Sequence, residues 1–230
     1  MRITPGMTTW ILLIGVPMLI GLWAQAKVSR AFKHWSQVRA ASNLTGAEAA
    51  QRILSAAGIQ DVEIVAIRDA LGDHYDPTHR RLCLSPEVYG TPSVAALGIA
   101  AHECGHAIQH SKAYAPLKWR MLAVPATQFA SQMLPIIFLA GLFFHAFHLL
   151  VVAIVCFLVL VIFNLITLPV EFDASRRAKV ILQQMGMVRE GEEAGGVNDV
   201  LNAAALTYVA AFVAALGQLI FFILQATRSR

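Results

Sequence analysis

The segment from Met121 to Val170 contains no Asp, Glu, Lys or Arg, and this absence limits the possible folds more than any other feature of the chain. The segment is too long for one helix across a bilayer, which needs about 20 residues. It divides at the polar His145 and His148, and two further apolar stretches lie near the ends of the chain. The sequence therefore predicts four membrane spans, at Met7 to Ala26, Val124 to Phe144, Leu149 to Val170 and Ala203 to Leu224.

The overall composition agrees with a membrane protein. Hydrophobic residues make up 57% of the chain, charged residues 14%, and the mean hydropathy is +0.60. A soluble domain would have roughly 25% charged residues. The first span is too poor in preceding charge for a cleaved secretory signal, because only Arg2 precedes it whereas Lys27 and Arg30 follow. We expect it to remain as an anchor.

Basic residues predict the orientation of the spans. Of the 18 Lys and Arg residues, 15 lie in two segments, 27–120 and 176–189, and the connection between the second and third spans has none. The positive-inside rule places both segments in the cytoplasm and both termini outside. The sequence pI is near 9.2. The basic residues flank spans without interleaved aromatic residues, so we expect the lipid bilayer, and no nucleic acid, as their partner.

These features predict a mainly α-helical, polytopic membrane protein with a cytoplasmic α+β subdomain of zincin type. Its predicted parts are an N-terminal anchor at 1–26, a catalytic subdomain at 27–120, a transmembrane hairpin at 121–170, a cytoplasmic loop at 171–202 and a C-terminal transmembrane helix at 203–230. The three cysteines are scattered and form no disulfide framework, which suits a reducing cytoplasmic compartment.

The catalytic subdomain has recognisable signals for a helix and two strands. Thr45 and Glu48 form a capping-box pattern that opens a helix to about Ala57, where Gly58 ends it. Strands are predicted at Val62 to Ile67 and at Arg81 to Ser85, with a turn-rich connection between them. We expect these strands to form a hairpin whose edge holds an extended peptide substrate. His74, Asp76 and His79 have no regular ligand spacing, so a role in the turn is favoured.

The motif His102-Glu103-Cys104-Gly105-His106 carries the chemistry. Four-residue spacing on a helix stacks both imidazoles on one face, where both reach one Zn²⁺, while Glu103 meets the water that the metal activates. Ser93 is a suitable N-cap for a helix reaching Lys112. The small residues Ala101, Gly105 and Ala107 allow another backbone to approach. The alternative is a buried helix whose histidines satisfy backbone carbonyls, and Cys104 is expected to be a small buried apolar residue.

A catalytic zinc needs a third protein ligand, and Glu171 is the candidate. It directly follows the third span, where a carboxylate is costly unless it is paired or bound to metal. An ion pair with Arg176 or Arg177 is the alternative. Asp173 is expected either to support a ligand histidine from the second coordination shell or to be a solvated charge.

Four motifs together resemble the YugP-type membrane zinc metallopeptidases, and they occur in the expected order. They are Asp73 to Pro77, Ala100 to Gln109, Pro169 to Ser175 and Ala205 to Ala210. The resemblance implies a bacterial plasma-membrane peptidase of gluzincin type, with His102, His106 and Glu171 as zinc ligands and Glu103 as base. The chain is similar, more distantly, to HtpX-like and CAAX-processing peptidases, which commonly have Asp four residues after the ligand Glu; here that position is Ser175.

The predicted reaction is hydrolysis of a peptide bond in a peptide or protein substrate, without a covalent intermediate. Zn²⁺ lowers the pKa of its water toward about 7, and Glu103 takes the proton and delivers it to the leaving amine. Tyr208 has the chemistry to donate a hydrogen bond to the oxyanion, but an aromatic residue at the membrane boundary explains it equally well.

Two other classes of function fit the sequence less well. A scaffold with a structural zinc would need a closed site of four ligands, often cysteines, which the motif does not supply. A transporter would need ionisable residues deep in its spans, and none of the 14 acidic residues lies there. Substrate, oligomeric state and protein partners stay open.

Overall fold

The computed structural model describes residues 5–69, 72–144 and 147–228. His145, where the long apolar segment was expected to divide, lies outside these ranges. The chain forms two compact units. One comprises residues 1–25, 119–168 and 206–230, and is called the membrane unit below; the other comprises 26–118 and 169–205, and is called the catalytic unit. The division falls inside long helices.

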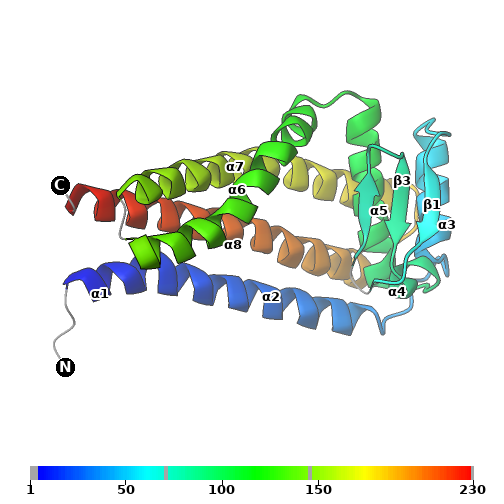
Figure 1. Ribbon diagram of the computed structural model, residues 1–230. Coiled ribbons are helices and arrows are strands. Elements are labelled where there is room, and N and C mark those ends of the chain that lie inside the picture. Colours follow the sequence, from blue (N-terminus) through cyan, green and yellow to red (C-terminus); the bar gives the residue numbers. More distant parts are fainter. Residues whose placement is uncertain (1–4, 70–71, 145–146, 229–230) are drawn as a thin grey trace. The chain divides into compact units, whose positions relative to one another are not determined.

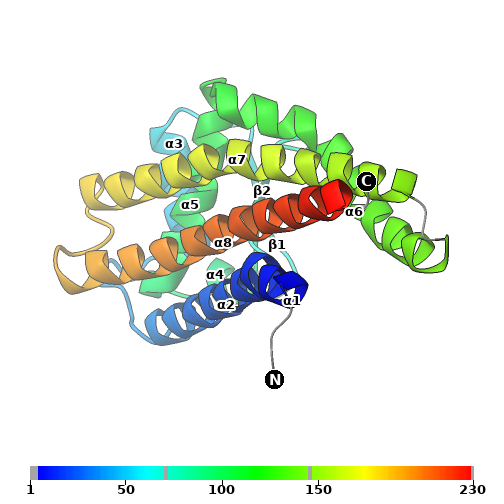
Figure 2. The same cartoon turned by 90° about the vertical axis from the view of Figure 1, so that its left-hand side faces the viewer.

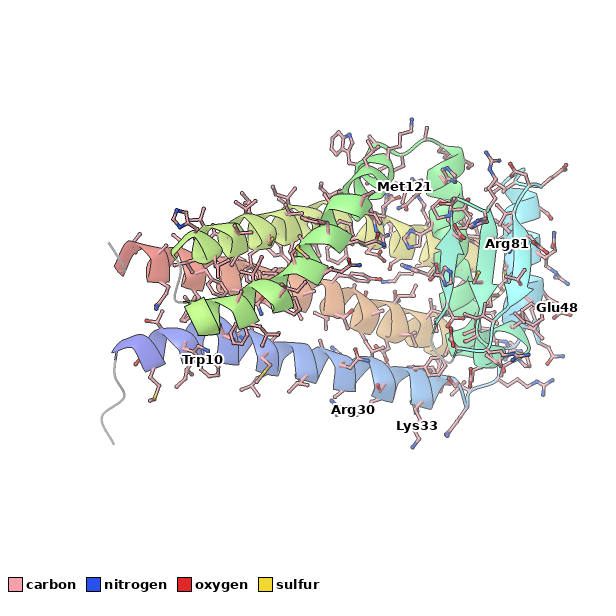
Figure 3. All side chains as sticks on the ribbon, in the orientation of Figure 1. Trp10, Arg30, Lys33, Glu48, Arg81 and Met121 are labelled. Carbon is pink, nitrogen blue, oxygen red and sulfur yellow. The ribbon has the colours of Figure 1, made fainter. Side chains whose placement is uncertain are left out.

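Among the described residues, four helical segments are long and apolar enough to cross a membrane, as the sequence predicts. They are α1 (Pro5–Trp10) with the π-helix η1 (Ile11–Gly15) and α2 (Val16–Trp35), then α6 (Ala115–Phe144), α7 (Phe147–Gln184) and α8 (Glu192–Arg228). The first segment begins near the exposed Trp10 and carries Arg30 and Lys33 near its end (Figure 3). Large apolar side chains such as Leu122 and Phe138 are 79% and 68% exposed. Such surfaces require an apolar solvent, which the bilayer supplies.

Inside the membrane unit, close packing relies on small and aromatic residues. Phe157 and Phe222 stack with ring centroids 5.1 Å apart. Gly217 lies against the backbone of Leu13, where a Cβ would find no space. Small residues of this kind let transmembrane backbones approach closely. A buried cluster is formed by Ala130, Ile137, Ala153 and Cys156.

The catalytic unit begins with the predicted capping box. Thr45 accepts a hydrogen bond from the backbone N–H of Glu48, whose carboxylate accepts from the N–H of Thr45. This opens α3 (Gly46–Ala56), and Gly58, with φ +72°, follows its C-cap. Both predicted ends of the helix are therefore confirmed.

The sheet differs from the expected hairpin. Its strands are β1 (Glu63–Ala66), β2 (His74–Asp76) and β3 (Arg81–Leu84), in the order β1-β3-β2 (Figure 1). The two predicted strands, β1 and β3, pair in parallel, so their antiparallel pairing was wrong. The antiparallel partner of β3 is β2. The tight turn between β2 and β3 accounts for this pairing. The Asp76 carboxylate closes the turn, because it accepts from the backbone N–H groups of Thr78 and His79 and bonds the His79 ring.

The motif helix α5 (Val94–Ser111) follows the sheet and the short α4 (Pro86–Tyr89). Ser93 caps it by accepting from the N–H of Ala96, as predicted. Helix α5 contacts α3, α4, β2 and β3. The side chains buried between these elements are Ile53, Leu54, Leu82, Leu84, Val88 and Leu97. This core holds the motif helix rigidly at the sheet.

Helices α7 and α8 run side by side from the turn at residues 185–191 (Figure 2). Gly186 and Gly191 have φ values of +61° and +89° there, which other residues adopt at a cost. Lys179 of α7 donates to Asn202 of α8 over 2.7 Å. Most of the segment 171–202, expected as a loop, is thus helical, and Glu171 lies within α7.

Candidate metal centre

Two histidines from α5 and one glutamate from α7 converge in the catalytic unit. The Nε2 atoms of His102 and His106 lie 3.2 and 3.6 Å from Oε2 of Glu171. Possible ligand atoms of the three residues all lie within 4.8 Å of one another. The two rings meet edge to face, with centroids 4.7 Å apart. The sequence predicted these three residues as a ligand set, and the structure brings all three together.

The spacing of these atoms suits a metal ion. Zinc binds imidazole nitrogen and carboxylate oxygen at about 2.0–2.2 Å, so two ligand atoms at a tetrahedral zinc lie roughly 3.4 Å apart. The contacts of Glu171 with His102 and His106, at 3.2 and 3.6 Å, bracket that separation. The second is longer than an ordinary hydrogen bond. The residues present therefore fit a zinc ion with three protein ligands.

The hydrogen bonds of Gln109 determine which nitrogen of His106 faces the metal position. The Gln109 amide nitrogen donates to the backbone carbonyl of Val170 over 2.8 Å and to Asp173 over 2.9 Å. Its carbonyl oxygen therefore faces Nδ1 of His106, at 3.0 Å, and accepts the proton from it. The Nε2 lone pair of His106 is left for a metal. Because Gln109 is fully buried, no water competes for this network.

His102 is held in the same manner by Ser175. The Ser175 hydroxyl lies 3.1 Å from Nδ1 of His102, which again turns Nε2 toward Glu171. Ser175 thus occupies the place expected for a supporting Asp in the related peptidases. Asp173 has a more distant position, because it contacts Gln109 and is paired with Arg176 and Arg177. The two arginines therefore pair with Asp173, while Glu171 faces the histidines.

Glu103 has the environment of a general base. It is 8% exposed, and its carboxylate accepts the backbone N–H of Tyr75 over 2.9 Å. Burial raises the pKa of Glu103 above its usual value, and the neighbouring His102 and His106 oppose that rise. A carboxyl whose pKa moves toward neutrality is better matched to proton transfer near pH 7.

The opposite face of α5 packs into the core. Cys104 is fully buried, its Sγ lies 3.8 Å from the carbonyl of Ala50 on α3, and burial raises the thiol pKa. A thiol that stays protonated is a poor metal ligand. Cys104 is therefore a small buried apolar residue, as expected, and contributes nothing to a closed four-ligand site.

Several other predicted residues take structural positions or stay predictions. His79 lies in the turn and pairs with Asp76, as expected, whereas His74 and Asp76 themselves belong to strand β2, where His74 contacts the carbonyl of Gly72. Tyr208 lies in α8 within the membrane unit, whereas the metal centre belongs to the catalytic unit. Its role as an oxyanion donor stays a prediction.

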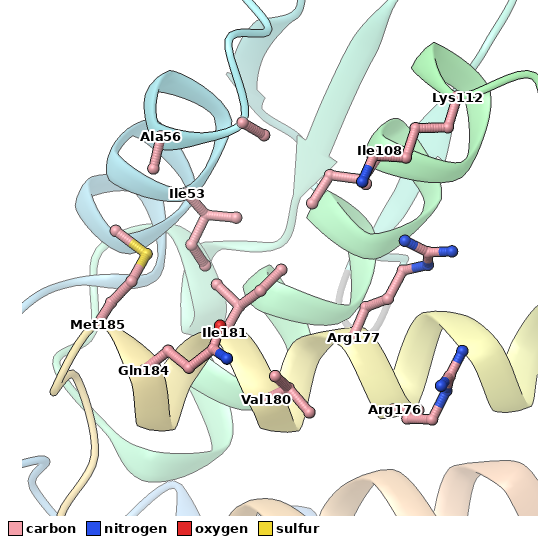
Figure 4. Close-up of a pocket in the computed structure, with 11 residues that line it drawn as sticks. Ile53, Ala56, Ile108, Lys112, Arg176, Arg177, Val180, Ile181, Gln184 and Met185 are labelled. Atoms are coloured by element: carbon pink, nitrogen blue, oxygen red, sulfur yellow. The ribbon is translucent and has the colours of Figure 1, made fainter.

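A cavity of about 590 Å³ opens between α3, the end of α5 and the end of α7 (Figure 4). Its floor is apolar, and its charged side chains are Lys112, Arg176 and Arg177. None of the three ligand candidates lines it. The cavity therefore does not contain the metal position.

Sequence reasoning missed the roles of Gln109 and Tyr75. Gln109 has a local signal, since residues three apart on a helix are neighbours and place it beside His106. Tyr75 has none, because its backbone reaches Glu103 only through the tertiary packing of β2 on α5.

Comparisons with known proteins agree with this site. Residues 10–227 match a family described as "Putative neutral zinc metallopeptidase". The chain is also 46% identical over 205 residues to the "Putative membrane protease YugP" of Bacillus subtilis (strain 168), covering 89% of this chain and 91% of that protein. No solved structure matches the chain.

Proposed function

Because the chain belongs to this family of neutral zinc metallopeptidases, we propose that it is a membrane-integrated endopeptidase with His102, His106 and Glu171 as its zinc ligands. The observation that carries the proposal is the convergence of both Nε2 atoms on Glu171 while Ser175 and Gln109 occupy both Nδ1 atoms. Two oriented imidazoles and one carboxylate leave a fourth position open, as catalytic zinc sites require.

Different groups carry out the separate steps of the proposed hydrolysis. Zinc, when bound, lowers the pKa of water and polarises the scissile carbonyl. Glu103 accepts the proton of the attacking water and passes it to the leaving amine. The N–H of Tyr75 holds Oε2 of Glu103, and Oε1, which has no hydrogen-bond partner among the described residues, can make this transfer. Because Gln109 and Ser175 contact the Nδ1 atoms of His106 and His102, the Nε2 atoms of both rings are directed at the metal position.

The outer edge of β2 is the proposed binding surface for the substrate backbone. Strand β2 is an edge strand beside β3. Neighbouring residues of an antiparallel strand direct their backbone groups to opposite sides. Since the N–H of Tyr75 reaches Glu103, its carbonyl also points away from β3 and can accept the N–H of an extended peptide. The substrate is then aligned directly beside the general base.

We place the metal centre on the cytoplasmic face of a bacterial plasma membrane, with processing or quality control of membrane proteins as its role. The predicted cytoplasmic segments 27–120 and 171–202, which supply the candidate ligands, contain 15 of the 18 basic residues. A membrane scaffold with a structural zinc is the alternative function. The buried Glu103 beside the ligand set favours a peptidase over a scaffold, because a structural zinc site does not require a general base.

The deciding experiment compares the zinc-loaded full chain with Glu103→Gln in detergent, using fluorescein-labelled casein and metal analysis. Glu103→Gln should retain about one zinc and lose about 10²–10⁴-fold in hydrolysis, the usual contribution of a general base. Glu87→Gln, at an exposed position on α4, is the matched control. Equal hydrolysis by Glu103→Gln and the parent would reject the enzyme assignment. Proteomic comparison of membranes containing either protein would then identify substrates.

A further inference from the structure

A third histidine of α5 lies on the same side of the helix as the ligand pair. His110 is four residues after His106, which places it about one turn further along α5. It is half-buried, and its Nδ1 lies 2.9 Å from the hydroxyl of Tyr75. The two rings are tilted, with centroids 5.9 Å apart. The contacts between His110 and Tyr75 do not hold His102, His106 or Glu171 in place, so His110 and Tyr75 can serve another role.

Tyr75 connects this histidine with the general base. Its backbone N–H donates to Glu103, and its hydroxyl bonds His110, each over 2.9 Å. One residue of the substrate-binding edge strand therefore contacts both groups. Because β2 is hydrogen-bonded to β3, Tyr75 is held at both its backbone and its side chain. Such double anchoring is typical of groups that need a fixed position beside a reacting bond.

The protonation states of the pair leave one donor available. Burial raises the pKa of Tyr75, so its hydroxyl stays protonated. Burial and the charge of Arg80 lower the pKa of His110, so its imidazole is neutral near pH 7. When the hydroxyl donates to Nδ1, the single proton of the imidazole is on Nε2. Among the described residues, this Nε2 has no hydrogen-bond partner.

We propose that Nε2–H of His110 donates to the oxyanion that forms on the scissile carbonyl, and that Tyr75 is the positioning residue for both His110 and Glu103. The inference rests on the proposed peptidase function. When water oxygen adds to the carbonyl carbon, the π electron pair moves to the carbonyl oxygen and His110 hydrogen-bonds it without transferring a proton. The proton of the water goes through Glu103 to the peptide nitrogen, and the C–N bond breaks as the electron pair of the oxyanion re-forms the carbonyl. His110 then supplies, within the catalytic unit, the donor for which the sequence offered Tyr208 as one of two interpretations.

The test uses Tyr75→Phe, His110→Asn and the double variant of the zinc-loaded full chain, with Tyr89→Phe and His34→Asn as exposed controls. Removing an oxyanion donor costs about 10²–10³-fold in kcat, so His110→Asn should lose that much while KM and zinc content stay unchanged. Tyr75→Phe should lose less in kcat, because it removes only the hydrogen bond that fixes the tautomer of His110 and leaves the imidazole in place. The double variant should match His110→Asn, because the two residues act as one unit.

Two readouts do not depend on hydrolysis. In the zinc-free protein, ¹⁵N NMR of histidine side chains should show His110 protonated on Nε2 in the parent and a mixture of tautomers in Tyr75→Phe. A peptide phosphonate, which mimics the tetrahedral intermediate, should bind His110→Asn about 10²-fold more weakly than the parent.

The outcomes separate this inference from the proposed function. Parental kcat and phosphonate affinity in His110→Asn, with Glu103→Gln inactive, would overturn the role of His110 and leave the peptidase standing. Protonation of His110 on Nδ1 would overturn the tautomer that the role requires. Activity equal to the parent in Glu103→Gln would instead overturn the peptidase itself.

Discussion

The backbone of Ala174 lies directly against Gly105: a Cβ at position 105 would be 2.8 Å from the Ala174 carbonyl oxygen and 3.1 Å from its Cα. This contact brings α7 onto the motif helix between the two histidines. Glu171 and Ser175 lie on either side of Ala174 along α7, so both can reach α5 only because position 105 has no side chain.

Gly105→Ala should therefore separate α7 from α5 and weaken zinc binding. Overpacking of this kind typically costs about 1–3 kcal/mol. Gly98→Ala is the matched control, since its Cβ would meet only Val197, at 3.6 Å and beyond, and alanine stabilises a helix by about 1 kcal/mol relative to glycine. Thermal unfolding in detergent and metal analysis measure both effects. Full zinc content in Gly105→Ala would show that the close approach is dispensable.

Glu171→Ala should lose most of its zinc, because only the two imidazoles remain and the carboxylate of the ligand set is gone. Glu190→Ala removes an exposed carboxylate from the turn after α7 and should keep about one zinc. Inductively coupled plasma mass spectrometry of both purified variants gives the comparison. Equal zinc content in the two would assign the third ligand to another residue.

Gln109→Leu and Ser175→Ala should each weaken zinc affinity by about 10–100-fold, as is usual when a support of a ligand histidine is removed. Gln109→Leu also removes the buried hydrogen bonds of Gln109 with His106, Val170 and Asp173, so it should lower stability as well. Gln183→Leu, at an exposed position of α7, is the control. Competition with a fluorescent zinc chelator measures the affinities, and control-like values for both variants would contradict this role.

The proposed orientation predicts different labelling on the two faces of the membrane. Thr227→Cys, near the end of α8, should react with an impermeant maleimide in intact cells, and Ser55→Cys on α3 should react only after permeabilisation. Both positions are exposed, whereas Cys83, Cys104 and Cys156 are buried and give a low background. Labelling of Ser55→Cys in intact cells would invert the topology.

Local signals predicted much of this structure. The caps at Thr45 and Ser93 satisfy backbone groups of their own helices, so four residues suffice to recognise them. The spacing of His102 and His106 places both on one face of α5 without knowledge of the fold. Glu171 was found because a carboxylate beside an apolar segment is costly without a partner.

Features that depend on tertiary contacts were not predictable. The pairing of β3 with both β1 and β2 depends on a three-residue strand, β2, whose length is too short for a periodic pattern. The bond from Tyr75 to Glu103 uses a backbone N–H, which every residue but proline possesses. Ser175 departs from the Asp of the related peptidases, and no local pattern indicates that its hydroxyl contacts Nδ1 of His102.

The location of Glu171 on α7 has a consequence for how the chain is made. The two histidines are synthesised early, but the third ligand follows the whole apolar stretch from Met121 to Val170. A ribosome-bound chain therefore has an incomplete ligand set until both central spans have been made and α7 has returned to α5. Under the proposed function, a chain made in this order therefore cannot hydrolyse peptides until its synthesis has passed the central spans.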